Sequence, residues 1–574
     1  MDIASAFPML ERAYLAGALR GRAKSLYRFA KFLYGQMTPL VVYGDGKLQI
    51  LGSRQGVRQG CPEAGKLFNI AMAPLIELLI AEVLADVEDK TTMFYYDDGF
   101  IINNNPNLMA MVVAFFERNR HTTGLALKVS KCKSFNLWDV KNGTIAFEKL
   151  GTIFGALEFR RVFINKRTDE LKDAVEKLKQ IKKQHSLILF KLSISTKLRH
   201  LLRTMDWTGL GGELRRIDEI FYDYLDFMRA LPEGEVRSGL AERIFSLPNR
   251  YGGLGILSMV EALPSAQTAG YQLANSVLIE RGLTSEDELT ALSDQMVAEG
   301  RRDRYSLSGS TPSVAEEIRG KVLVKQGVLM EQKFKEEHAE FCNSLDQEQL
   351  LQFVDNKAGV KCFNALPHGK YRMISNTQMT ALVNIFALRP KHPGPICQCG
   401  DANYLGHCDA CNGVRETAAM TSMSHNCIVS KSAENLNKEK GTKSKIETMI
   451  YENYPNINNQ QRADFKIEAQ DGHFIPQTGL FDLMTKVVAA PHTIPARQAA
   501  RTKAARDGVV DPVKIANLEI QAALQVHYDS KTYKYRNAIR MGIKLVPLIV
   551  SSGGTLHSVY KKIRKEALPT AHLA

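Results

Sequence analysis

Two adjacent aspartates, Asp97 and Asp98, lie between two short apolar runs in the segment TMFYYDDGFII. Short apolar runs on either side of a turn predict a tight β-hairpin, and we expect Gly99 to permit the turn. Two carboxylates at a hairpin tip repel each other unless cations neutralise them. Hard divalent cations such as Mg²⁺ prefer carboxylate oxygens. The pair therefore indicates either an exposed acidic turn or a metal site.

Four other segments accompany this hairpin within the first 155 residues. DIASAF contains Asp2, GVRQGCPEAG occupies residues 56–65, GLALKVSKCK occupies 124–133 and KLGTIFG occupies 149–155. In this order and spacing, the five segments resemble the palm of a reverse transcriptase. They are most similar to the palms of non-LTR retrotransposons, in which the acidic hairpin reads Tyr-X-Asp-Asp. The nucleotide-contacting loop of that family reads Gly-X-X-Gln-Gly-X-Pro.

The resemblance implies a catalytic role for three carboxylates. Asp2 and Asp97 would bind two Mg²⁺ ions, as in polymerases generally, and Asp98 would assist. One ion would activate the 3′-hydroxyl of the primer, and the other would stabilise the leaving pyrophosphate. The implied enzyme is an RNA-directed DNA polymerase, whose partners are an RNA template, a DNA primer and deoxynucleoside triphosphates.

Three more residues acquire binding roles from the same resemblance. Gln59 and Gly60 would contact the incoming nucleotide and the template. Lys131 would lie near the triphosphate, although a solvated surface lysine is the alternative for this residue. Asp2 directly follows Met1, so the strand that carries this aspartate in the family, and the fingers, are expected to be missing. A truncated palm of this kind is expected to bind RNA and DNA but to extend a primer poorly or not at all.

The charge of the chain is concentrated after the palm. Lys and Arg number 75 and Asp and Glu number 61, which gives a net charge of +14. Residues 159–203 contain thirteen of the basic residues but only four acidic ones. A basic helical segment at the place of the thumb would follow the phosphates of a nucleic acid duplex. A solvated helix face is the alternative.

A cysteine and histidine cluster follows a helical stretch. The spacing Cys-X-Cys, then His and Cys within residues 396–412, suits a tetrahedral Zn²⁺ site that is closed and structural. Cys408 is a competing ligand, and an incidental cluster is the alternative. The pattern resembles the Cys-Cys-His-Cys knuckle between polymerase and nuclease in retrotransposons with a restriction-like endonuclease. The expected zinc ligands are Cys397, Cys399, His407 and Cys411.

Beyond this cluster, RADFKIEAQ and TGLFDLMTKVVA are typical of strands, and a long helix and a buried strand, IKLVPLIV, follow. The segments resemble the endonuclease of the same retrotransposons, with Ala463 in place of a proline. The resemblance implies that Asp464 and Asp482 hold Mg²⁺ and that Lys531, or secondly Lys534, positions the attacking water. A nuclease-like fold that only binds DNA is the alternative.

Together these patterns predict an α+β multidomain protein. The expected function is reverse transcription and DNA nicking for target-primed insertion; the alternative is a non-catalytic nucleic-acid-binding remnant. We expect an intracellular location, nuclear or cytoplasmic, because no secretory signal is evident. No membrane span is expected, since the longest apolar stretch, residues 71–85, contains Pro74, Glu77 and Glu82. The expected domains are a palm (1–165, fingers missing), a thumb-like helical region (166–300), a helical linker (301–395), a zinc knuckle (396–412) and an α/β restriction-like endonuclease (413–574).

Overall fold

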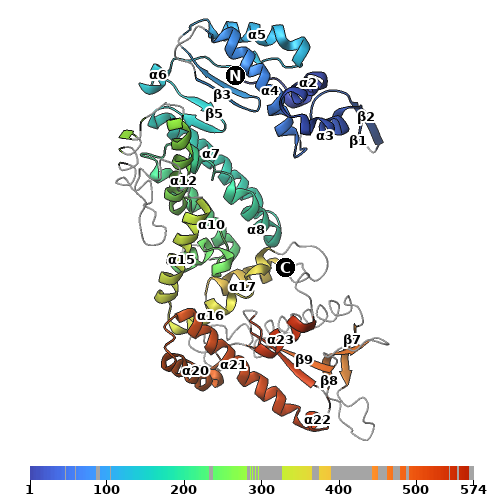
Figure 1. The fold of residues 1–574 in the computed structure, drawn as a ribbon. Helices are drawn as coiled ribbons and strands as arrows, with labels where there is room; N and C mark the ends of the chain where they lie inside the picture. Colours follow the sequence, from blue (N-terminus) through green and yellow to red (C-terminus); the bar gives the residue numbers. More distant parts are fainter. Residues whose placement is uncertain are drawn as a thin grey trace. The chain divides into compact units, whose positions relative to one another are not determined.

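The chain divides into two compact units, Met1–Ala156 and Leu157–Ala574. The structure is a computed structural model, shown in Figure 1. The four expected zinc ligands and Gln59 lie outside the residues that it describes. The described residues are 1–44, 47–58, 60–85, 91–103, 105–231, 237–280, 285, 287–288, 291, 295, 326–364, 374–388, 442–449, 462–469, 479–486, 490–541, 543, 545–551 and 555–567.

The first unit combines antiparallel hairpins with helices around one core. Two of its strands pair antiparallel, with Thr38 opposite Ser53 and Gly44 opposite Lys47. The elements are α1 (Ala6–Met9), α2 (Arg12–Arg22), α3 (Lys24–Tyr34), β1 (Thr38–Gly44), β2 (Lys47–Ser53), α4 (Ala64–Val83), β3 (Thr91–Tyr95), β4 (Asp98–Ile102), α5 (Leu108–Thr123), η1 (Val129–Lys131), α6 (Leu137–Lys141), β5 (Phe147–Lys149) and β6 (Thr152–Phe154).

Helix α4 is the centre of this core. Leu67, Phe68, Ala71, Leu75 and Leu79 are buried at spacings of three and four residues, which places them on one helix face. Among the described residues, α4 is the helix that is long and apolar enough to cross a membrane by length and composition. In this fold, however, its buried face packs with residues of α2 and α5.

The second unit begins with a helical region. The first unit ends at Ala156, whereas we expected the palm to extend to residue 165. Helix α10 is held to its neighbours by buried polar contacts: Asp218 accepts from the Ser258 hydroxyl and the Met259 N–H, at 2.6 Å each. The helices are α7 (Leu157–Lys179), α8 (Lys183–Leu192), α9 (Leu201–Thr204), α10 (Gly211–Arg229), α11 (Gly239–Ser246), α12 (Met259–Glu280), α15 (Gln326–Ser344), α16 (Gln347–Asn356) and α17 (Asn376–Phe386).

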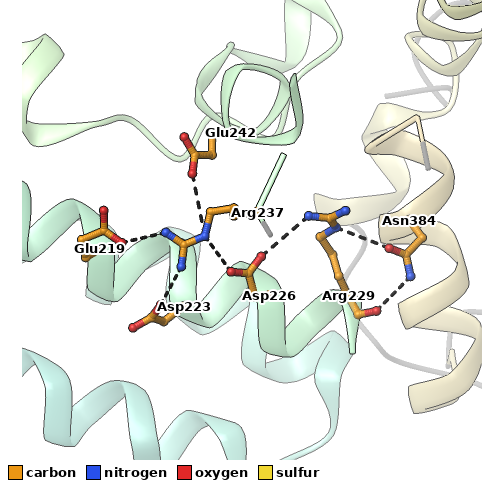
Figure 2. Close-up of polar contacts among 7 residues, drawn as sticks. All are labelled: Glu219, Asp223, Asp226, Arg229, Arg237, Glu242 and Asn384. Carbon is orange, nitrogen blue, oxygen red and sulfur yellow. Dashed lines mark hydrogen bonds and ion pairs between the residues drawn. The ribbon is translucent and has the colours of Figure 1, made fainter. Parts of the chain in front are cut away.

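A group of charges, which we call the Arg237 cluster, joins two of these helices. Figure 2 shows the Arg237 guanidinium among carboxylates from α10 and one from α11. The α10 carboxylates lie within 2.7 Å of its nitrogens, and that of Glu242 lies at 3.7 Å. Beside the cluster, the Asn384 side chain donates to the Arg229 carbonyl at 2.9 Å, which ties α10 to α17. The three acids from α10 are Glu219, Asp223 and Asp226.

The C-terminal part contains a mixed four-stranded sheet with the order β10-β9-β8-β7. Strand β10 runs parallel to β9, while β8 runs antiparallel to both β9 and β7. The strands and long helix predicted from the sequence are confirmed. For β7, β8 and β9 the structure describes the backbone. The elements are β7 (Thr442–Met449), β8 (Arg462–Ala469), β9 (Gly479–Lys486), α20 (Ile494–Arg506), α21 (Pro512–Lys534), α22 (Arg536–Arg540), β10 (Leu545–Ser551) and α23 (Ser558–Ala567).

The helices expected to form a linker pack directly on this C-terminal part. Phe341 of α15 and Phe353 of α16 share a buried core with Ile520 of α21 and Ile549 of β10. Helix α21 begins at Pro512 because the Asp511 carboxylate caps it by accepting from two backbone N–H groups of its first turn. The helical region and the C-terminal sheet therefore form a common core.

Candidate active site

The backbone brings Asp2 to the acidic hairpin. Asp2 lies opposite Asp98 in an antiparallel bridge. The N–H of Ile3 donates to the carbonyl of Asp97 (3.2 Å), and the N–H of Gly99 donates to that of Met1 (3.2 Å). These flanking bonds make Asp2 and Asp98 a non-hydrogen-bonded pair, the arrangement in which facing side chains come closest. Asp2, which is far from the hairpin in the sequence, thus belongs to the same short stretch of pairing as the adjacent Asp97 and Asp98.

The hairpin itself is confirmed, but the expected role of its glycine was wrong. Tyr95 pairs with Asp98, so the two-residue turn consists of Tyr96 and Asp97. The positive φ that such turns require falls on Tyr96 (55°). Gly99 instead lies in β4, where a Cβ would come within 2.6 Å of the Phe94 ring. Gly99 therefore makes room for a neighbouring ring.

Two lysines accompany the carboxylates. The Nζ of Lys131 lies 3.5 Å from Oδ2 of Asp2, and the Nζ of Lys149 lies 2.6 Å from Oδ1 of Asp98. The Asp2 and Asp98 side chains are 29% and 36% exposed, so water screens both pairs. Sequence reasoning assigned Lys131 to the site but missed Lys149, although Lys149 begins the quoted segment KLGTIFG. These contacts offset two of the three negative charges.

The donors present are suited to Mg²⁺. Among the described residues, no group of three or more His, Cys, Asp or Glu side chains is arranged to hold a metal ion. Mg²⁺, however, is usually held by one or two carboxylates together with substrate phosphates and water, rather than by a cage of protein ligands. Asp2 and Asp97, from neighbouring backbone segments, are donors of that kind. The residues of the site therefore fit the ion.

The loop that follows β2 is anchored on the chain just after Asp2. The N–H of Gly56 donates to the carbonyl of Leu10 at 2.9 Å. Gly56 has a φ of 71°, and a Cβ there would lie 2.3 Å from the carbonyl oxygen of Pro8, so only glycine fits. Gly60, expected to contact the nucleotide, also has a positive φ (86°). The loop thus starts from a fixed point beside the site.

Arg12 is a residue of this region that sequence reasoning missed. Its guanidinium reaches the ends of α3 and β2 and the start of the loop at Gly56, where it donates mainly to backbone carbonyls. A single arginine in an ordinary helix gives no sequence signal for such a role. The acceptors are the carbonyls of Tyr34, Gln36, Ser53, Gln55 and Gly56 and the hydroxyl of Ser53.

The comparison with known families now identifies this unit. Residues 1–154 match the family described as reverse transcriptase (RNA-dependent DNA polymerase). The N-terminal unit is a reverse transcriptase domain. Such domains copy an RNA template with nucleotide substrates and generally use Mg²⁺. No curated protein matches the chain.

The expected nuclease acids occupy neighbouring strands. Asp464 lies in β8 and Asp482 in β9, and these strands pair antiparallel with Phe465 opposite Phe481. Extending this register by one residue would set Asp464 opposite Asp482. Lys531 lies in α21, which packs against β10, and its Nζ is 5.6 Å from the centre of the Tyr535 ring. The strand positions are compatible with a shared acidic site.

Part of the positive charge in residues 159–203 serves the fold. Lys183 is buried, and its Nζ donates to the Phe227 carbonyl (2.8 Å) near the C-terminal end of α10. The Nζ of Lys191 donates to Oδ1 of Asn364 (2.6 Å), and burial lowers the pKa of Lys191 to about 8. The net charge of this segment therefore overstates the charge that can face a nucleic acid.

Proposed function

We propose that the chain carries the reverse transcriptase and the DNA-nicking endonuclease of a non-LTR retrotransposon. The pairing of Asp2 with Asp98, within a domain that matches the reverse transcriptase family, is the observation that carries the polymerase half. Its partners are an RNA template, a DNA primer, deoxynucleoside triphosphates and a target duplex. The protein then acts inside the cell, in the nucleus or cytoplasm.

In the polymerase, Asp2 and Asp97 would hold the metal ions. When bound, these ions supply activation of the 3′-hydroxyl and stabilisation of the leaving pyrophosphate. Lys131 lies beside Asp2 and is exposed, so its ammonium can turn toward the triphosphate. Gln59 and Gly60, which follow the fixed Gly56 in the sequence, would contact the incoming nucleotide and the template.

A primer-extension assay tests this half. Any RNA-templated incorporation of deoxynucleotides should require Mg²⁺ and should disappear in Asp97→Ala, because the metal ligand is lost. Asp139→Ala, a change in the same unit outside the acidic pairing, is the matched control and should retain incorporation. RNA binding without incorporation in the unaltered chain would favour the alternative, a non-catalytic nucleic-acid-binding remnant.

The nuclease half rests on the mixed sheet and the register of β8 and β9. Asp464 and Asp482 would hold Mg²⁺, and Lys531, or secondly Lys534, would position the attacking water. Nicking of supercoiled DNA should need Mg²⁺ and vanish in Asp482→Ala while DNA binding survives. The exposed Asp507, at the end of α20, provides the control Asp507→Ala. If the unaltered chain binds DNA but never nicks it, the binding-remnant alternative gains.

The zinc knuckle completes the proposal. Thiolate and imidazole ligands in residues 396–412 favour one structural Zn²⁺ held by Cys397, Cys399, His407 and Cys411. Metal analysis of the purified chain should return about one zinc ion per molecule. Cys399→Ser should remove it, whereas Cys408→Ser should not. Loss of zinc in Cys408→Ser alone would show that the ligand set is different.

A further inference from the structure

A stack of aromatic rings docks the β5–β6 hairpin beside β4. The ring of Phe147 stacks on those of Phe100 (6.0 Å between centroids), Phe135 (4.4 Å) and Phe154 (4.9 Å). The planes of each pair lie within 23° of parallel. This stack fixes the hairpin at a defined place along β4.

The stack also fixes a charged pair. Asp98 precedes Phe100 by two residues on β4, and Lys149 follows Phe147 by two residues on β5. Side chains two residues apart in a strand share a face. Because Phe147 stacks on Phe100, Lys149 therefore lies beside Asp98. The Nζ–Oδ1 distance is 2.6 Å, and the same Nζ donates to the Met1 carbonyl at 3.3 Å.

The two lysines of the site differ in how firmly they are held. The Lys149 side chain is 20% exposed, lies next to a tight turn and has two oxygen partners. The positive φ values of Leu150 (50°) and Gly151 (73°) define this turn. The Lys131 side chain is 58% exposed and lies 3.5 Å from Asp2. Lys149 is thus held in place, whereas Lys131 is open to solvent.

We propose that Lys149 is a positioning residue of the polymerase, whose ammonium holds Asp98 as a counter-ion and keeps it out of the metal ligand set. This inference rests on the proposed polymerase function. Asp2 and Asp97 then supply the protein ligands for the metal ions. The physical reason is local charge: an ammonium in contact with Asp98 relieves its repulsion with the neighbouring carboxylates and occupies one of its two oxygens.

Binding of Mn²⁺, followed by electron paramagnetic resonance on the full chain without nucleotide, tests the assignment. All variants are compared in an Asp482→Ala background, which removes the proposed nuclease metal site. Asp97→Asn should weaken binding by more than about tenfold, as loss of a metal-site group does. Asp98→Asn should change it by less than about threefold, because a partly solvated ion pair is worth little. Lys149→Met should tighten binding by freeing a carboxylate. The exposed Lys133 gives the matched control Lys133→Met, which should leave binding unchanged.

The double variant Lys149→Met with Asp98→Asn separates the proposed role from a simple loss of positive charge. If Lys149 acts through Asp98, the tightening disappears in the double variant. Tightening that persists there, or Asp98→Asn weakening binding as much as Asp97→Asn, overturns the assignment. Absence of Mn²⁺ binding in the unaltered chain refutes the metal site of the proposed polymerase and this assignment with it. Normal binding and variant effects without primer extension would instead contradict only the polymerase activity.

Discussion

The acidic site of the reverse transcriptase domain and the Arg237 cluster both crowd carboxylates together. In the site, the chain pairing of Asp2 with Asp98 gathers the acids, and each lysine contacts one carboxylate. In the Arg237 cluster, one guanidinium contacts three carboxylates within 2.7 Å. Burial lowers the pKa of Arg237, but the surrounding carboxylates raise this pKa by more, so the net shift is upward.

The difference between them lies in the donor. A guanidinium has five N–H groups in a rigid plane and can satisfy several carboxylates at once, whereas an ammonium is a compact point charge. In the Arg237 cluster, one guanidinium accordingly contacts carboxylates of both helices and joins α10 to α11 (Figure 2). In the site, by contrast, each of the two lysines contacts a single carboxylate. Among the described residues, one side chain thus joins the acids of the Arg237 cluster, whereas no side-chain cation is shared by the acids of the site. In the proposed polymerase, a metal ion would take that shared place.

The largest effect should come from removing the guanidinium. Arg237→Met removes the cation shared by the four carboxylates, although Arg229 stays 3.7 Å from Asp226. Because the Glu219 and Asp223 side chains are 63% and 64% exposed, water screens part of the loss, and the free energy of unfolding of the second unit should fall by about 2 kcal/mol. Arg237→Lys should recover part of this loss. Fluorescence of the buried Trp207 during urea unfolding, in a Trp138→Phe background, reports this unit alone. An unchanged free energy of unfolding in Arg237→Met would contradict the structural role of the Arg237 cluster.

A smaller effect should distinguish the site by its response to metal. Free Mg²⁺ at ten times its dissociation constant should stabilise the first unit by about 1.4 kcal/mol, because the ion binds only the folded state. Hydrogen exchange of the amides in residues 1–10 and 91–102 measures this protection. It should be absent in Asp97→Ala. Equal protection at α10 and α11 that persists in Asp482→Ala, which lacks the proposed nuclease metal site, would show that the Arg237 cluster also binds the ion.

Much of the fold could be predicted because local patterns specify it. The alternating and apolar runs around Asp97, and those that became β8, β9 and β10, indicated strands correctly. Turn details were less accessible, since the positive φ falls on Tyr96, a residue type that rarely adopts it, although a glycine, Gly99, follows three residues later. Local propensity favours glycine in such turns, but the packing of the Phe94 ring takes precedence here.

Site residues that belong to a sequence motif could be predicted, whereas residues that join the site only through tertiary contacts could not. Asp2, Asp97 and Asp98 were assigned from motif order, and the domain match supports the family they imply. The contact of Lys149 with Asp98 depends on rings that meet only after folding, and the carbonyls around Arg12 belong to separate elements. Lys183 was counted as surface charge because sequence periodicity does not reveal a lysine buried at another helix's end.

The smallest effect should come from Glu242, the fourth carboxylate of the Arg237 cluster. Of the four carboxylates, that of Glu242 lies farthest from the Arg237 guanidinium, at 3.7 Å. Burial raises the pKa of Glu242, although the positive charge of Arg237 opposes the shift. An acid whose pKa is raised in the folded state holds its proton there at pH values where the unfolded chain has lost it. Its contribution to stability therefore grows as pH falls through that window.

Glu242→Gln should consequently unfold at a slightly higher urea concentration than the unaltered chain at pH 7. The difference should shrink as pH falls below the ordinary pKa of a glutamate, near about 4.3, where both side chains are neutral. The exposed Glu340 supplies the control Glu340→Gln, for which no such convergence is expected. If Glu242→Gln is instead clearly destabilised at pH 7, then Arg237 needs all four carboxylates, and the fourth is part of the joint between α10 and α11.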